Sequence, residues 1–96
     1  GESWNDGGVI NVAEGAWVHV AVAVSPTSSK IYLNGVLKTT SNFTSPVSWT
    51  NTNTVNIGAG GPSFSYWNHL SDQSAMDELR FFNRTLTDQE ILQLMN

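Results

Sequence analysis

The sequence contains no cysteine, which excludes a disulfide framework and also excludes thiolate ligands for zinc or redox chemistry. Charge is scarce as well, because charged residues make up 12% of the 96 residues, about half the usual share. Solubility must therefore come largely from neutral polar groups, and the chain is rich in serine, threonine, asparagine and glycine. That composition favours short strands joined by many turns.

Basic residues are especially few. The chain has four of them, Lys30, Lys38, Arg80 and Arg84, and its net charge is −4. No cationic stripe is available to neutralise phosphates, so nucleic acid and anionic membrane surfaces are disfavoured as partners. The sequence also lacks an apolar run of about 18 residues, and we therefore predict no membrane span.

What the sequence does contain is a series of short β-prone runs. The strongest covers residues 17–25, where valines alternate with Trp17, His19 and two alanines. Both faces of this run are largely apolar, which predicts a central strand covered on both sides, with Trp17 in the core. Further strands are predicted over residues 9–12, 54–58 and 75–83.

Two local signals predict defined structure. Asn34-Gly35 separates two β-prone runs within residues 30–40 and predicts a hairpin with a type I′ turn, with Leu33 opposite Val36. Residues 87–95 predict a short helix, because Thr87 and Glu90 have the spacing of a capping box. Leu86 and Ile91 are placed for the hydrophobic contact that often accompanies such a cap.

Five segments together resemble the laminin-G-like jelly-roll family of the concanavalin A-like lectin/glucanase superfamily. They are residues 17–22 (WVHVAV), 31–35 (IYLNG), 56–58 (NIG), 76–86 (MDELRFFNRTL) and 87–91 (TDQEI). The resemblance covers roughly residues 10–96 and is strongest to the C-terminal portion of the family. It implies an all-β antiparallel β-sandwich with one short C-terminal helix, in a protein that is extracellular, on the cell surface or periplasmic.

Length is where the chain departs from this family. Residues 1–96 are predicted to be a single sandwich domain that is incomplete, because several strands before Trp17 are absent. Half of a sandwich leaves an apolar sheet face and unpaired strand edges in water. We therefore expect a second chain or a second copy to complete the sandwich, and we expect the segment to be part of a longer protein.

Aromatic residues in two predicted loops are the candidate binding residues. Sugars pack their apolar C–H faces on aromatic rings, and their hydroxyl groups bond to amide side chains. The candidate ligand-binding residues are Trp49, Asn51, Tyr66, Trp67 and Asn68. Three roles remain open for the rings: contact with a glycan, contact with a protein partner, or packing over the open ends of the sandwich.

Acidic residues offer little for catalysis. Asp77 and Glu78 are adjacent in a predicted strand, so their side chains point to opposite faces and cannot act on one bond. Related glucanases use carboxylates that are spaced along one strand face, and that pattern would need an acidic residue at position 75 or 79 of this chain. These positions are Ala75 and Leu79. Asp77 is either a structural hydrogen-bond acceptor or a calcium ligand; apart from that calcium, no cofactor is expected.

These observations predict a non-catalytic extracellular binding module, with carbohydrate recognition as the first hypothesis. The ligand is a glycan or a protein. The alternatives are a structural or protein-interaction accessory domain of a larger secreted or surface protein, and a glycoside hydrolase fragment.

Overall fold

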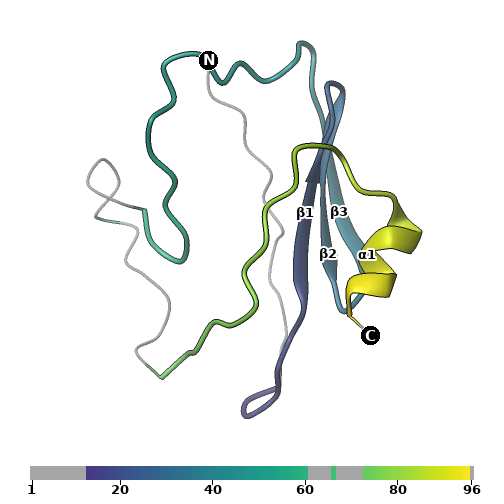
Figure 1. Cartoon of the computed structure of the whole chain (residues 1–96), viewed down its shortest axis with the longest axis vertical. Helices are drawn as coiled ribbons and strands as arrows, with labels where there is room; N and C mark the ends of the chain where they lie inside the picture. The colour runs from purple at the N-terminus through teal and green to yellow at the C-terminus, as the bar shows by residue number, and fades with distance from the viewer. Residues whose placement is uncertain (1–12, 61–65, 67–72, 96) are drawn as a thin grey trace. The chain divides into compact units, whose positions relative to one another are not determined.

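The computed structural model describes residues 13–60, 66 and 73–95. Within these residues it contains the strands β1 (Val20–Val24), β2 (Ser28–Leu33) and β3 (Val36–Asn42), and the helix α1 (Asp88–Leu94). The strands form one antiparallel sheet in the order β1-β2-β3, and Figure 1 shows α1 on one side of that sheet. The predictions of antiparallel β-structure and of a short C-terminal helix are confirmed to this extent.

The chain divides into two units that are described separately. One unit comprises residues up to 48 together with residues from 82 onward, and we call it the hairpin unit. The other unit is Trp49–Phe81, which we call the loop unit. The hairpin unit contains all three strands and the helix.

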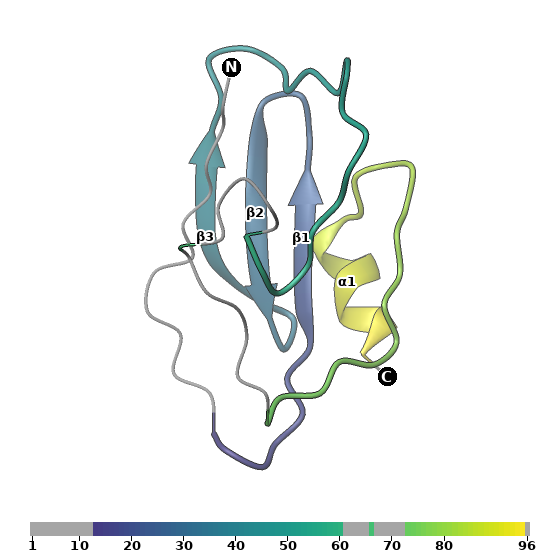
Figure 2. The same cartoon turned by 90° about the vertical axis from the view of Figure 1, so that its left-hand side faces the viewer.

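The hairpin between β2 and β3 turns at Asn34 and Gly35, as predicted. Both residues have positive φ, 49° and 78°, which is the backbone conformation that a type I′ turn requires at its two central positions. Leu33 lies opposite Val36, so the predicted register is correct at the turn. Figure 2 shows the three strands of the resulting sheet side by side.

Helix α1 begins where the sequence predicted. Thr87 is the N-cap: its hydroxyl accepts a hydrogen bond from the Glu90 backbone N–H at 3.2 Å. The Glu90 carboxylate in turn accepts the Thr87 backbone N–H at 3.1 Å, which completes the capping box. Ile91 is buried and Leu86 packs against the same apolar cluster, so the predicted contact between these two residues is supported.

The core of the hairpin unit lies between α1 and one face of the sheet. Ala23, Tyr32 and Ile91 form a buried apolar cluster, and Ala21 packs beside it. Ala21 is the register partner of Tyr32, so both side chains share the helix-facing side of the sheet. The small alanines of β1 leave room for the Tyr32 ring and for α1.

The opposite face of the sheet carries the β1 valines. Val20 and Val22 are 59% and 62% exposed, and Val36 at the start of β3 is also exposed. The prediction of a central strand covered on both sides is therefore wrong for the described residues, in which β1 is an edge strand. We call the exposed side chains of Val20, Val22 and Val36 the valine face.

Two further strand predictions are wrong for the described residues, because the predicted segments lack a pairing partner there. A strand persists only when its backbone pairs with another strand, and residues 54–58 and 75–83 form no ladder in the described structure. Leu79 and Phe81, which lie in the second of these segments, are exposed, and Trp17 is 71% exposed rather than buried. The strand predicted over residues 9–12 lies outside the described residues.

Candidate functional site

The candidate binding residues all belong to the loop unit. Trp49, Asn51 and Tyr66 are described by the structure, whereas Trp67 and Asn68 lie outside the described residues. Trp49 is 66% exposed and Tyr66 is 70% exposed, so both rings present most of their surface to solvent. They are not part of the apolar core of the hairpin unit.

A tight turn places Trp49 and Asn51 together. The Trp49 carbonyl accepts a hydrogen bond from the Thr52 backbone N–H at 3.1 Å, which closes a four-residue turn. Asn51 has φ of 65°, a left-handed conformation that asparagine tolerates better than most residues. The turn thus holds an exposed indole and an exposed amide side chain two residues apart.

The acidic pair of the loop unit is engaged locally. An Asp77 carboxylate oxygen accepts the Glu78 backbone N–H at 2.8 Å, and Glu78 has φ of 58°. The Glu78 carboxylate is 3.1 Å from the Arg80 guanidinium, in an exposed ion pair of little energetic weight. Asp77 is thus a hydrogen-bond acceptor for an exposed backbone N–H.

Metal ligation by Asp77 stays a prediction. Among the described residues, no cluster of three or more histidine, aspartate or glutamate side chains is placed to hold a metal ion. Nor does this part of the chain contain a helix long and apolar enough to cross a bilayer.

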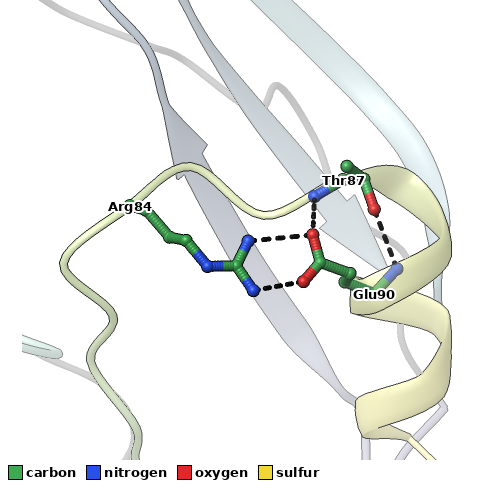
Figure 3. A network of polar contacts seen from close by, with 3 residues as sticks. All are labelled: Arg84, Thr87 and Glu90. Carbon is green, nitrogen blue, oxygen red and sulfur yellow. Dashed lines mark hydrogen bonds and ion pairs between the residues drawn. The ribbon is translucent and has the colours of Figure 1, made fainter.

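A polar cluster that sequence reasoning only partly anticipated stands at the start of α1. Two guanidinium nitrogens of Arg84 donate hydrogen bonds to the two carboxylate oxygens of Glu90 (Figure 3). The Nη1–Oε1 distance is 2.9 Å. This bidentate contact and the Thr87 N–H lower the pKa of Glu90 to about 2. The capping box was predictable from its spacing, but nothing in the sequence required Arg84 to fold back onto it.

A second polar contact joins the sheet to the helix. The buried Tyr32 hydroxyl donates a hydrogen bond to the Asp88 carboxylate at the first residue of α1. Burial, followed by this hydrogen bond, raises the pKa of Tyr32 to about 12. The two residues are 56 positions apart, so no local pattern could have indicated the pair.

Comparison with curated proteins finds no match to this chain. Among solved structures, the chain is similar to a 2.1 Å crystal structure of an S-layer domain-containing protein (residues 221–444) from Clostridium thermocellum ATCC 27405. The two are 28% identical in sequence, with a TM-score of 0.70. The match covers 92% of this chain and 43% of the crystallised one, so this chain spans less than half of that structure.

A family model described as the concanavalin A-like lectin/glucanases superfamily matches residues 2–92. The match extends across the hairpin unit and the loop unit and includes each of the segments that carry the resemblance. The chain therefore belongs to the concanavalin A-like lectin/glucanase superfamily.

Proposed function

We propose that this chain is a non-catalytic binding module that recognises carbohydrate through the loop unit. The observation that carries the proposal is the turn from Trp49 to Thr52, which holds an exposed indole two residues from the exposed amide of Asn51. An indole face stacks on the apolar side of a pyranose ring, and an amide both donates to and accepts from its hydroxyl groups. The exposed Tyr66 adds a second ring of the same kind.

The membership of the superfamily supports a binding role, because its description includes lectins as well as glucanases. The arrangement of the acidic side chains favours binding over hydrolysis. Asp77 is turned onto the adjacent backbone and Glu78 is paired with Arg80, so the two carboxylates do not form the facing acid and base that glycoside hydrolysis needs. Release of reducing ends from a polysaccharide by the purified chain would contradict the non-catalytic assignment.

The test is a binding titration with a panel of soluble polysaccharides, measured by calorimetry or affinity electrophoresis. Trp49→Ala is expected to weaken binding by about 5- to 160-fold, since loss of a stacked ring removes about 1–3 kcal/mol by analogy with stacking on nucleic-acid bases. Trp17→Ala is the matched control, because Trp17 is equally exposed but lies in the hairpin unit. Equal effects of the two substitutions, or no binding across the panel, would refute the proposal.

The proposal also includes a second β-sheet that completes the sandwich, supplied by a second chain or a second copy. The valine face supports it, because three exposed β-branched side chains on a pleated surface fit the inner layer of a sandwich. Light scattering coupled to gel filtration measures the assembly directly. A monomer that binds no hydrophobic dye would show that this face needs no partner.

A cell-surface, secreted or periplasmic location belongs to the same proposal. Its support is the similarity to an S-layer domain-containing protein, together with the neutral polar composition of the chain. This neighbour also keeps a structural or protein-interaction role as the second candidate function. Surface labelling of intact source cells with an antibody against the chain tests the location.

A further inference from the structure

The hairpin unit contains a small polar recess, separate from the loop unit, where the start of α1 meets the β1–β2 turn. Its volume is about 90 Å³, enough for several water molecules or for one edge of a small ligand. Ala23 and Leu86 contribute apolar surface to it. Its polar lining residues are Ser25, Ser28, Lys30, Tyr32, Thr85 and Asp88.

Two opposite charges line this recess and set what it can hold. Lys30 lies on the helix-facing side of the sheet as the register partner of Ala23, and its ammonium group forms no hydrogen bond or ion pair with another described residue. Asp88 uses one carboxylate oxygen to accept the Tyr32 hydroxyl proton. A simple anion is attracted by Lys30 but repelled by Asp88, and the reverse holds for a simple cation, so neither sign of ion gains from the pair. The recess therefore favours a neutral ligand that both accepts and donates hydrogen bonds.

The hydroxyl groups of the recess are already oriented. The Ser25 hydroxyl accepts the backbone N–H groups of Thr27 and Ser28, at 3.2 and 3.0 Å, and lies 3.3 Å from the Ser28 hydroxyl. The Thr85 hydroxyl donates to the Val24 carbonyl and retains its capacity to accept. These contacts fix the polar groups before any ligand arrives, which reduces the entropy lost on binding.

We infer that this recess binds a pair of neighbouring hydroxyl groups, as found on the edge of a sugar ring or a cyclic polyol. One hydroxyl accepts from the Lys30 ammonium group, and the other donates to the Asp88 carboxylate. The apolar surface of Ala23 and Leu86 faces the carbon skeleton of the ligand. This site uses none of the residues of the proposed glycan site in the loop unit, so each of the two proposed sites can be refuted without the other.

The test is an NMR titration of the nitrogen-15-labelled chain with the methyl glycosides of glucose, galactose and mannose. We expect saturable shifts of the Ser25, Ser28 and Lys30 amides with at least one glycoside, at millimolar concentrations. Lys30→Met keeps a long unbranched side chain, one atom shorter than that of lysine, and removes its charge. It is expected to weaken binding about tenfold or more, in line with the loss of a charged hydrogen bond.

Lys38→Met is the matched control, because Lys38 is an exposed lysine of β3 that does not line the recess. It is expected to leave the titration unchanged, and so is Trp49→Ala, which tests the loop unit. Absence of saturable shifts with all three glycosides would overturn the inference and would indicate that solvent or a Lys30–Asp88 ion pair fills the recess. Unchanged affinity in Lys30→Met, or equal shifts with inorganic phosphate, would overturn it as well.

Discussion

The contact between the β2–β3 turn and α1 gives the sharpest prediction about what holds the hairpin unit together. Gly35 has φ of 78°, and a methyl group added to it would lie 2.7 Å from a Leu92 side-chain carbon and 3.0 Å from the Met95 sulfur. Gly15 has a similar φ of 73° but no neighbouring atom within 4 Å of the same added group. The two glycines therefore share a backbone requirement and differ only in their surroundings.

The magnitude follows from these two terms. An L-residue in the left-handed region costs about 1–2 kcal/mol, of which the smaller entropy of unfolded alanine offsets roughly 0.4–1 kcal/mol. Gly15→Ala is thus expected to destabilise the chain by about 1 kcal/mol. Gly35→Ala adds an overpacking penalty of about 1–2 kcal/mol, toward the low end because the atoms it meets are the ends of flexible side chains.

The assay is urea and thermal unfolding followed by far-ultraviolet circular dichroism. Each further 1 kcal/mol of destabilisation lowers Tm by roughly 4–8 °C in a domain of this size. Gly35→Ala is therefore expected to lower Tm by at least this much more than Gly15→Ala does. A double-mutant cycle with Leu92→Ala isolates the contact, because removal of the Leu92 side chain should shrink the Gly35→Ala penalty. Equal penalties at the two glycines, or a penalty at Gly35 that Leu92→Ala leaves unchanged, would refute the packing of this turn on α1.

Three further predictions concern the start of α1. Thr87→Ala removes the cap and is expected to lower the free energy of unfolding by about 1 kcal/mol, whereas Thr87→Ser keeps it; chemical denaturation compares the two. Tyr32→Phe leaves Asp88 without its hydrogen-bond donor and should cost about 0.5–1.5 kcal/mol in the same measurement; an unchanged free energy of unfolding would contradict a stabilising role for this contact. The pKa of Glu90 is about 2 in the folded chain against an ordinary value of 4.5. Its contribution to stability is therefore present above pH 4.5 and lost as pH falls toward 2, and Glu90→Gln should flatten the unfolding profile across this acid range.

The elements that the sequence predicted correctly are those whose signals are local. Asn34 and Gly35 supply the two positive φ values of their own turn, and the register of the flanking residues follows from the turn length. Thr87 and Glu90 satisfy each other within one helical turn. Neither case depends on a residue far away in the chain, so composition and spacing were sufficient.

The strands over residues 54–58 and 75–83 show the opposite case. Alternation of apolar and polar residues states which face a strand would bury, but it does not identify the strand that would pair with it. Leu79 and Phe81 lie in a segment with such a pattern, but they remain exposed because no described strand pairs with that segment. In the candidate site, the loop position of Trp49 was predicted but the turn from Trp49 to Thr52 was not. The Tyr32–Asp88 contact in the hairpin unit could not be inferred from the sequence either.

The two faces of β1 connect these points. Its alanine face is small because Tyr32 and Ile91 fill the space beside it, whereas its valine face is large and is exposed at Val20 and Val22. β-Branched residues at alternate positions raise strand propensity on either face, so propensity alone does not explain an uncharged surface of this kind. Burial does explain it, since the edge strands of soluble proteins are often protected by charged side chains, and β1 is an edge strand of the described sheet. The absence of charge from Val20 and Val22 therefore favours a covered state of this face, and Val22→Lys distinguishes the two explanations: it should disrupt assembly if the face is covered, and leave a monomer unchanged if it is not.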